Sequence, residues 1–316
     1  MSKKILIITG LTASGKTSLG VDICKKIGGE IISADSRQVY KSMDIGTGKD
    51  IGKAKFKLVK KINNMNIGYY KIDEVPIWLL DVVEPNYQFS TADFVNLSLK
   101  VINDIQARGK KVVVVGGSGY YIESLLNPAD SISIKPNLWL RKILNKLGIK
   151  NIIKIYKLLD NSSYENLNKS EQYNKHRLIR KIEIKLSQKK PTKINKTDFE
   201  TMTVYLDADK KLISQRIEKR VKKRLDQGLL TEIEYLKNKY GWESPGLNCL
   251  AYKEFKPYFE NNQNIKNCIE NWIKDEIKYA KRQKTWFKNK DCLKFDVEKD
   301  SLEMIIEKVI KWYNLV

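Results

Sequence analysis

The feature that most constrains the fold is a glycine-rich segment near the N-terminus, residues 4–17, with the sequence KILIITGLTASGKT. Its first half contains the apolar run Ile5–Ile8, which has the length of a buried parallel strand. Glycines follow at positions 10 and 15, then a lysine, a threonine and an amphipathic run. An ordinary glycine turn is the alternative, but all four fixed positions and both flanks match a phosphate-binding loop.

Each residue type in this loop has a physical role. Glycines let backbone N–H groups turn inward around an anion, and the N-terminus of the following helix adds the positive end of its dipole. Lys16 can reach an outer phosphate, and the Thr17 hydroxyl can coordinate a Mg²⁺ ion that bridges phosphate oxygens. The loop therefore predicts a polyphosphate and Mg²⁺, but it does not identify the molecule that carries the phosphates.

The composition excludes several classes of protein. The chain has 316 residues, of which 42% are hydrophobic, enough for one large domain or for one domain with an insert. No apolar run is long enough to span a membrane, and the N-terminus enters a strand without a signal-like segment, so we expect a cytoplasmic protein. With one histidine and four scattered cysteines, we expect reduced thiols and neither a zinc site nor a Ser-His-Asp triad.

The charge distribution favours a nucleic acid as a partner. The formal net charge is +22, and residues 141–200 hold 16 Lys/Arg against 6 Asp/Glu. Concentrated positive charge is typical of nucleic-acid binding, although a solvated basic face is the simpler alternative. The chain has 50 lysines and only 9 arginines, so an arginine is expected where a planar fork is needed. Seven of the nine lie in segments that are singled out below for their motifs or helical spacing: Arg37, Arg177, Arg180, Arg216, Arg220, Arg224 and Arg282.

Two further short strands are predicted to end in polar residues. Glu30–Ser33 runs into Asp35, and Lys111–Val115 runs into a glycine turn that contains Ser118. Ligands of open α/β sheets bind outside the carboxyl ends of the strands, so both side chains are expected beside the phosphate loop. Asp35 can accept a proton from an attacking nucleophile. Its alternative role is that of an N-cap or turn aspartate.

The remaining pattern predicts an α/β core with an insert. Residues 41–76 read as a basic loop, and Ile77–Val83 as a buried strand. Residues 128–200 lose the strand–helix alternation and read as a basic all-helical insert, which leaves 1–127 and 201–316 as the core. Other expected elements are a helix from Ser90 or Thr91 to about Arg108, strands at 203–207 and 292–297, and helices ending near Gly228 and over 229–240, 265–288 and 301–314.

One of these helices carries three arginines in a row. Arg216, Arg220 and Arg224 are spaced four residues apart and therefore share a face. Three like charges on one face repel one another, and a bound anion would offset this repulsion. A solvated face partly neutralised by Glu218 and Asp226 is the alternative.

These observations predict a P-loop NTPase-like parallel sheet flanked by helices, with the basic helical insert. Two classes of enzyme remain open on the residues alone. A kinase would pass a phosphoryl group from a nucleotide to a hydroxyl, and a transferase would hold another diphosphate and move the group attached to it. Both classes need the loop, Mg²⁺ and a base.

Over nearly its full length the chain resembles the tRNA dimethylallyltransferase family, also called the tRNA isopentenyltransferase or IPP transferase family. The resemblance rests on eight motifs in the family's order. They are Gly10–Thr17, Ile32–Tyr40, Met43–Thr47, Val115–Tyr120, His176–Arg180, Gly228–Glu232, Ala251–Lys253 and Lys281–Phe287. Leu11 stands where the family usually has proline, Ser118 replaces a threonine, Ala251 replaces a glycine, and residues 51–76 look longer than usual.

The resemblance implies transfer of a dimethylallyl group. The loop would hold dimethylallyl diphosphate, and the N6 amine of the adenosine at tRNA position 37, next to the anticodon, would attack C1 of the allyl group. Asp35 would accept the amine proton, and Ser118 would bind near the amine. Lys16, with Arg216 or Arg220, and Mg²⁺ on Thr17 would stabilise the leaving diphosphate. The diphosphate site would comprise Gly10, Thr12, Ala13, Ser14, Gly15, Lys16 and Thr17.

The resemblance also implies how tRNA is bound. The adenosine must leave its stack to reach the site. The expected tRNA contacts are Asp35, Ser36, Arg37, Gln38, His176, Arg177, Arg180, Tyr252 and Lys253. We expect a monomer whose partners are the anticodon stem-loop of tRNA and dimethylallyl diphosphate, with no membrane. The alternatives are an isopentenyltransferase acting on free adenine nucleotides, a small-molecule kinase and a pure RNA-binding protein.

Overall fold

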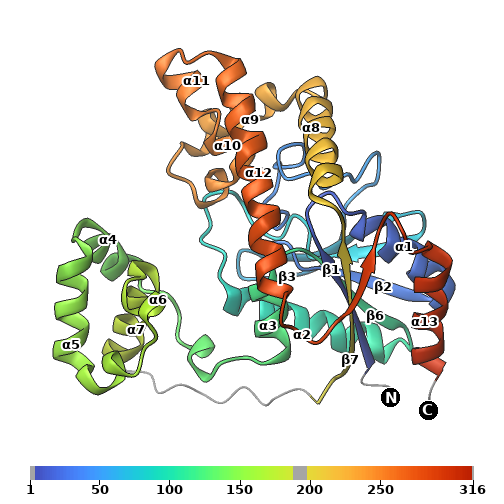
Figure 1. Cartoon of the computed structure of the whole chain (residues 1–316), viewed down its shortest axis with the longest axis horizontal. Coiled ribbons are helices and arrows are strands. Elements are labelled where there is room, and N and C mark those ends of the chain that lie inside the picture. The colour runs from blue at the N-terminus through green and yellow to red at the C-terminus, as the bar shows by residue number, and fades with distance from the viewer. Residues whose placement is uncertain (1–3, 188–197, 315–316) are drawn as a thin grey trace. The chain divides into compact units, whose positions relative to one another are not determined.

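The computed structural model describes residues 4–187 and 198–314 (Figure 1). By its internal contacts the chain forms two compact units: a larger one, residues 1–126 with 197–316, and a smaller one, residues 127–196. The larger unit is built on an eight-stranded sheet with the order β3-β4-β5-β2-β6-β1-β7-β8. Its strands are β1 (Lys4–Gly10), β2 (Gly29–Ser33), β3 (Lys57–Ile62), β4 (Met65–Ile72), β5 (Val75–Trp78), β6 (Lys111–Val115), β7 (Glu200–Asp207) and β8 (Leu293–Asp296).

The centre of the sheet is parallel, as the apolar runs in the sequence predict. Strand β1 lies between β6 and β7 and pairs in parallel with both, and the side chains of Ile5–Ile8 are fully buried. Strands β2 and β5 extend the parallel part on one side, and β8 extends it on the other. The expected α/β fold with a P-loop-type parallel sheet and flanking helices is therefore confirmed.

The segment before the third expected strand differs from the prediction. Residues 41–76 were expected to form a loop, but β3 and β4 form an antiparallel hairpin, with Asn63 in the left-handed region at its turn. The expected strand Ile77–Val83 is also shorter, because β5 ends at Trp78. Leu79 and Asp81 both have positive φ angles (65° and 53°), which a continuous strand does not allow.

Helices cover both faces of the sheet. α1 and α13 pack against one face with a shared apolar cluster that includes Leu19, Ile23, Ile305 and Val309, and α2 packs against β2 and β6 (Figure 1). Ser90 caps α2 through a reciprocal bond with Asp93, which settles the expected start of that helix. The helices of this unit are α1 (Lys16–Ile27), α2 (Thr91–Ala107), α3 (Gly119–Leu126), α8 (Lys210–Asp226), α9 (Leu229–Tyr240), η2 (Pro245–Asn248), α10 (Leu250–Lys253), α11 (Lys256–Asn261), α12 (Ile265–Phe287) and α13 (Leu302–Asn314).

The smaller unit is helical in the part that the structure describes and has its own core. Ile152, Leu178 and Ile182 are completely buried in it. The buried carboxylate of Glu183 binds the guanidinium groups of Arg141 and Arg180. These two partners lower the pKa of Glu183 and more than offset its burial, so it stays charged inside the unit. The helices are η1 (Asp130–Ser133), α4 (Leu138–Lys146), α5 (Ile149–Glu165), α6 (Lys169–Gln172) and α7 (Lys175–Leu186).

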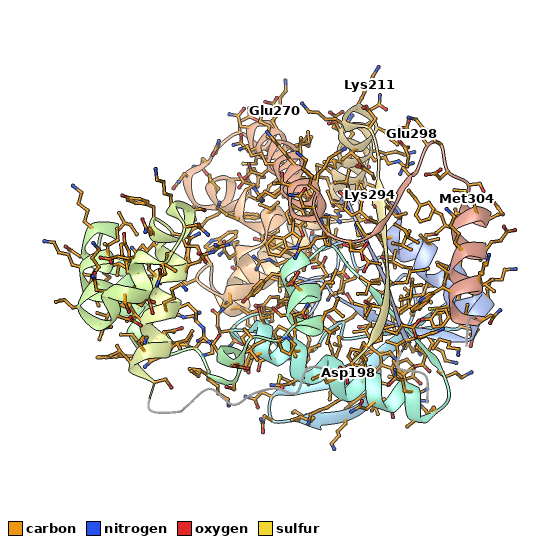
Figure 2. The ribbon with its side chains drawn as sticks, turned by 60° about the horizontal axis from the view of Figure 1, so that its bottom comes forward. Asp198, Lys211, Glu270, Lys294, Glu298 and Met304 are labelled. Atoms are coloured by element: carbon orange, nitrogen blue, oxygen red, sulfur yellow. The ribbon has the colours of Figure 1, made fainter. Side chains whose placement is uncertain are left out.

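The surface of the molecule is rich in charged side chains. Figure 2 shows Lys211, Glu270 and Glu298 pointing away from the ribbon, and all three are exposed. Within residues 4–187 and 198–314, no helix has the length and apolar character needed to cross a membrane.

Candidate active site

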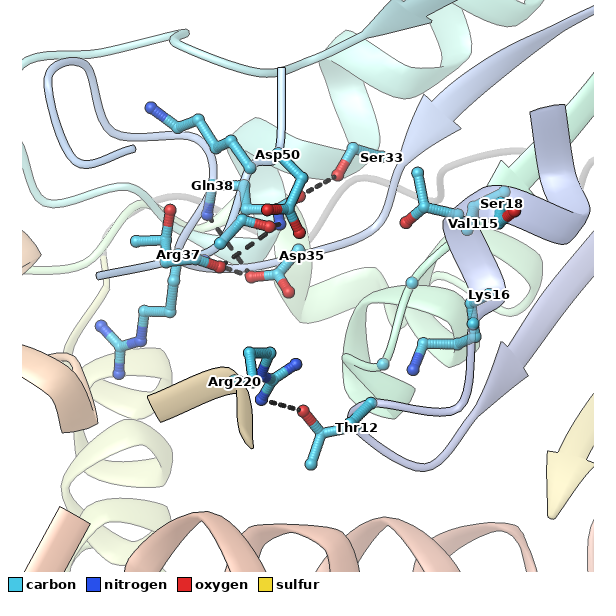
Figure 3. A pocket seen from close by; sticks show the side chains of 18 of the residues that line it. Thr12, Lys16, Ser18, Ser33, Asp35, Arg37, Gln38, Asp50, Val115 and Arg220 are labelled. Carbon is cyan, nitrogen blue, oxygen red and sulfur yellow. Dashed lines mark hydrogen bonds between the residues drawn. The ribbon is translucent and has the colours of Figure 1, made fainter. Parts of the chain in front are cut away.

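A cavity of about 980 Å³ lies at the carboxyl ends of the central parallel strands. The loops after β1, β2 and β6 line it, and helices α8 and α12 contribute further residues. Figure 3 shows the side chains of Lys16, Asp35 and Arg220 around the same open space. The ends of these parallel strands meet at one edge of the sheet, so the topology brings together three segments that are far apart in the sequence.

The phosphate loop joins β1 to α1 in a conformation that requires glycine. Gly10 has a φ of 144°, and a Cβ at this position would overlap the backbone of Leu206 on β7. Lys16 Nζ donates to the carbonyl oxygens of Leu11 (2.6 Å) and Gly10 (3.2 Å). Burial and the neighbouring Arg220 lower the pKa of Lys16 to about 8, and Asp35 acts in the opposite direction. An anion in the cavity would favour the charged form of this lysine.

The structure gives the three arginines of α8 different surroundings. Arg220 Nη2 donates to Thr12 Oγ1 (2.7 Å) and to the carboxylate of Glu276 (3.0 Å), and Arg216 Nη1 reaches the carbonyl oxygen of Ala13 (3.4 Å). Arg224 is buried, donates to the carbonyl oxygen of Gly46 (3.2 Å) and lies over the ring of Trp272. Arg216 and Arg220 therefore flank the phosphate loop, whereas Arg224 faces the loop that contains Gly46.

Two buried polar atoms beside the loop have no hydrogen-bond partner among the described residues. They are Ser14 Oγ, in the loop itself, and Nε of Arg220. Buried donors of this kind are rare in native proteins unless water or a ligand satisfies them. Together with the charges of Lys16 and Arg216, they fit a site that accepts a strongly anionic group.

The loops that carry Asp35 and Ser118 meet at the ends of β2 and β6. The N–H of Ser36 donates to Ser118 Oγ (3.2 Å), so the two loops are joined directly. Asp35 Oδ1 accepts the N–H groups of Arg37 (2.8 Å) and Gln38 (3.4 Å), which is the turn geometry expected for its alternative role. The carboxylate also lines the cavity. Its two oxygens provide about four acceptor sites, so the turn and a role as proton acceptor are compatible.

The remaining residues of the second motif line the same cavity. Ser36, Arg37 and Gln38 are all half-buried in its wall. The side-chain amide of Gln38 donates to the carbonyl oxygen of Gly48 (3.0 Å) and accepts from Ser33 Oγ (3.3 Å). This fixes the orientation of the amide.

The predicted RNA contacts on α7 belong to the smaller unit. His176 and Arg177 are exposed, and Arg177 pairs with Glu171 at 3.5 Å. Arg180 donates to the carbonyl oxygens of Ser131 and Ile134, both at 2.7 Å. Its guanidinium group therefore supports the fold of this unit.

Tyr252 and Lys253, on the short helix α10, have different environments. Lys253 is exposed, but Tyr252 is completely buried, and its hydroxyl donates to Glu232 (2.8 Å). The same carboxylate accepts the backbone N–H groups of Asp44, Ile45 and Gly46, each at 2.9 Å. Tyr252 therefore affects the cavity indirectly: its hydroxyl binds Glu232, and Glu232 holds the backbone of residues 44–46, of which Gly46 lines the cavity.

Sequence reasoning missed several residues of the cavity. Lys49 is buried and donates to the carbonyl oxygen of Tyr40 (2.7 Å) and to the carboxylates of Asp44 and Asp81. Glu276, Tyr279, Arg282 and Gln283, all on α12, also line the cavity. Arg282 and Gln283 lie inside the motif Lys281–Phe287, but nothing in that motif indicates where they point.

The oxygen donors in the cavity fit a Mg²⁺ ion held mainly by a substrate. Thr17 is exposed at the start of α1, lines the cavity and presents a hydroxyl. In the part of the chain that the structure describes, no group of three or more His, Cys, Asp or Glu side chains could hold a metal ion. Mg²⁺ usually binds through one or two protein ligands, water and phosphate oxygens, so this donor set suits an ion that arrives with a polyphosphate.

Comparison with known proteins identifies the family. Residues 38–290 match the protein family described as IPP transferase. The chain is 34% identical over 320 residues to the tRNA dimethylallyltransferase of Carboxydothermus hydrogenoformans, covering 98% of this chain and 97% of the relative. It is 30% identical to the solved structure of tRNA delta(2)-isopentenylpyrophosphate transferase from Staphylococcus epidermidis, with a TM-score of 0.66, covering 98% and 99% of the two chains.

A further solved structure shares the fold. It is a eukaryotic dimethylallyltransferase acting on tRNA, 24% identical, with a TM-score of 0.78 over 99% of this chain and 80% of the other. The family match spans most of the chain and includes Gln38, the Ser118 turn, α8 and α12. A family match of this extent, together with a relative that is 34% identical over nearly the full length, shows that the chain belongs to the IPP transferase family.

Proposed function

We propose that the chain is a tRNA dimethylallyltransferase. It transfers the dimethylallyl group of dimethylallyl diphosphate to the N6 amine of the adenosine at tRNA position 37 and releases diphosphate. The single observation that carries this proposal is the shared cavity. An anion cradle of Lys16, Arg216 and Arg220 faces a potential proton acceptor, Asp35, in one space. The names of the full-length relatives support the same reaction.

The proposed reaction forms one bond and breaks another. The N6 lone pair attacks C1 of the allyl group, the C1–O bond breaks, and its electrons leave with the diphosphate. Positive charge develops on the allyl group and negative charge on the leaving oxygen. Lys16 and Arg220 stabilise that negative charge from fixed positions, which is the most effective form of electrostatic catalysis. A Mg²⁺ ion bound at Thr17 would neutralise part of the diphosphate charge.

Asp35 completes the proton balance. The amine nitrogen becomes acidic as it attacks, and the carboxylate of Asp35 accepts its proton. The N–H groups of Arg37 and Gln38 donate to Oδ1 and hold the carboxylate in the wall of the cavity. We propose that Ser118, whose Oγ accepts the N–H of Ser36, binds near the amine.

The proposed tRNA site combines cavity and surface residues. The adenosine leaves its stack and enters the cavity beside Ser36, Arg37 and Gln38. Exposed His176, Arg177 and Lys253 are candidate contacts to the anticodon stem-loop. We propose that the protein acts as a cytoplasmic monomer.

The decisive experiment follows radiolabelled dimethylallyl diphosphate in parallel tubes that contain unmodified tRNA or AMP. The label should appear on tRNA, and mass spectrometry of digested tRNA should find one prenyl group on the adenosine 3′ of the anticodon. Label on AMP at comparable efficiency and not on tRNA would instead identify a free-nucleotide enzyme. A third tube with ATP tests the kinase alternative, which requires phosphoryl transfer. Binding of tRNA without turnover in any tube would instead indicate a pure RNA-binding protein.

The pKa of Lys16 predicts a pH dependence. The free protein keeps this lysine charged below about pH 8 and loses the proton above it, because burial and Arg220 lower its pKa. The charged form binds diphosphate, so KM for dimethylallyl diphosphate should be flat near pH 7 and rise above pH 8, by up to about tenfold per pH unit. Measuring KM from pH 6.5 to 9.5 tests this. Lys16→Arg, which stays charged, should abolish the inflection if the variant remains active, and an unchanged inflection would assign it to another group.

The smaller unit should supply salt-dependent tRNA affinity. Replacing Lys181, Lys185, Lys189 and Lys190 by glutamine should flatten the plot of log K against log salt by about 0.7–0.9 for each tRNA phosphate that the variant no longer neutralises. Lys181 and Lys185 lie on α7, and Lys185 already pairs with Asp160, whereas Lys189 and Lys190 lie outside the described residues.

A charge-matched control replaces exposed lysines of the larger unit: Lys294, Lys299, Lys308 and Lys311. Equal slopes for the two variants would mean that the basic face of the smaller unit is merely solvated.

A further inference from the structure

Gln283 on α12 connects two loops that line different parts of the cavity. Its side chain is almost completely buried. Oε1 accepts the backbone N–H of Thr12 at 2.7 Å, and Nε2 donates to the carbonyl oxygen of Gly117 at 3.1 Å. Both bonds are buried and span more than 160 positions in the sequence. One planar amide thus ties the loop after β1 to the loop after β6.

The two loops serve different substrates in the proposed reaction. Thr12 belongs to the phosphate loop, and its hydroxyl accepts from Arg220. Gly117 precedes Ser118, whose Oγ accepts the N–H of Ser36 next to Asp35. Gln283 therefore spans from the diphosphate cradle to the pair of residues proposed to meet the amine.

The surroundings of Gln283 are shaped for this contact. A Cβ on Gly117 would overlap Nε2 of Gln283, so glycine is needed for the close approach. Tyr279, one turn earlier on α12, donates to the same Gly117 carbonyl at 3.3 Å. A glutamine offers a donor and an acceptor on one rigid group, whereas glutamate lacks the donor and methionine lacks both strong groups.

We propose that Gln283 is a positioning residue, which sets the separation between the diphosphate cradle and the Asp35–Ser118 pair. This inference rests on the proposed function. Displacement requires the attacking nitrogen within about 3–3.5 Å of C1, and a misplacement of about 1 Å costs roughly 10²-fold in rate. Loss of the two bonds lets the loops move independently, so it lowers the rate of the chemical step more than the affinity for either substrate.

Gln283→Met tests this proposal, because it keeps the side-chain volume and removes both bonds. We expect kcat with saturating substrates to fall roughly 10–100-fold. The Kd for tRNA should stay within about twofold and KM for dimethylallyl diphosphate within a few-fold. The matched control is Gln172→Met in the smaller unit, where the amide also donates to backbone carbonyls, those of Leu167 (3.0 Å) and Tyr164 (3.4 Å). That variant should keep the wild-type kcat.

A double-mutant cycle with Ser118→Ala separates positioning from general stability. If Gln283 acts by placing the Ser118 loop, removing the hydroxyl should cost clearly less in the Gln283→Met background than in the wild type. Three results would each overturn the inference: additive effects of the two substitutions, a wild-type kcat in Gln283→Met, or a kcat of Gln283→Met that returns to the wild-type value when it is measured well below the Tm of the variant. Gly117→Ala disturbs the same contact from the other side and provides a second variant if Gln283→Met does not fold; a wild-type kcat in that variant also overturns it. A wild-type protein that prenylates nothing would overturn the proposed function instead, and the inference with it.

Discussion

Replacing Asp35 by asparagine is expected to slow prenyl transfer by about 10²–10⁴-fold, the usual cost of losing a general base. The substitution is selective, because the asparagine oxygen can still accept the N–H groups of Arg37 and Gln38 that Asp35 Oδ1 accepts. The turn should therefore survive while the proton acceptor is lost. Single-turnover rates with saturating dimethylallyl diphosphate and tRNA measure the effect on the chemical step.

The competing role of Asp35 makes a different prediction. If its carboxylate only stabilises the turn, Asp35→Asn should spare the rate, and any loss of stability should be about 1 kcal/mol or less. Comparing Tm with the single-turnover rate for Asp35→Asn and Asp35→Ala distinguishes the two roles. A general base predicts a large rate loss in both variants, whereas a purely structural residue predicts a lower Tm in Asp35→Ala and an unchanged rate in Asp35→Asn.

Lys16→Ala should lower the transfer rate by roughly 10²–10³-fold or more, because it removes a preorganised charge beside the leaving diphosphate. The Lys16 ammonium group lies over the phosphate loop, bound to the carbonyl oxygens of Gly10 and Leu11. Thr17→Ala, which removes the hydroxyl proposed to coordinate Mg²⁺, should give a loss of the same order. Rapid-quench measurement of tRNA prenylation at saturating substrate tests both variants.

Binding measurements show whether these losses have the proposed origin. The loop contacts diphosphate, so the Kd for tRNA should stay nearly unchanged in Lys16→Ala. Lys26→Ala removes an exposed lysine from the other end of α1 and serves as the control. Wild-type turnover in Lys16→Ala would reject the site, and an equal loss in Lys26→Ala would point to damage to the helix.

The predictable part of the fold depends on local signals. The apolar run Ile5–Ile8, the glycines of the phosphate loop and the cap of α2 at Ser90 each determine the structure of their own neighbourhood. The helix with Arg216, Arg220 and Arg224 also formed where its spacing predicted it. The hairpin of β3 and β4 was missed, because an exposed edge strand with the sequence KLVKKI lacks the apolar pattern of a buried strand.

The sequence predicts which loops form the site but not the side-chain contacts between them. The positions of Lys16, Asp35 and Ser118 after predicted strands indicate one edge of the sheet, because the strand ends of a parallel sheet meet there. The sequence could not separate Arg220 from Arg224, since one binds Thr12 and the other Gly46, both about two hundred positions away. Tyr252 was expected to contact RNA, yet it is buried against Glu232. A motif reveals which residues belong together, but not which way each side chain faces.

The lysine-rich strand β3 has a consequence for self-association. Among residues 4–187 and 198–314 it is the terminal strand of the sheet and pairs only with β4, so these residues leave its other backbone edge open to strands of other molecules. Lys57, Lys60 and Lys61 are exposed along it, and an irregularity in register between Leu58 and Lys60 interrupts its pairing. Charge and irregular geometry both oppose edge-to-edge addition, so the same lysines that conceal this strand in the sequence protect the folded sheet against aggregation.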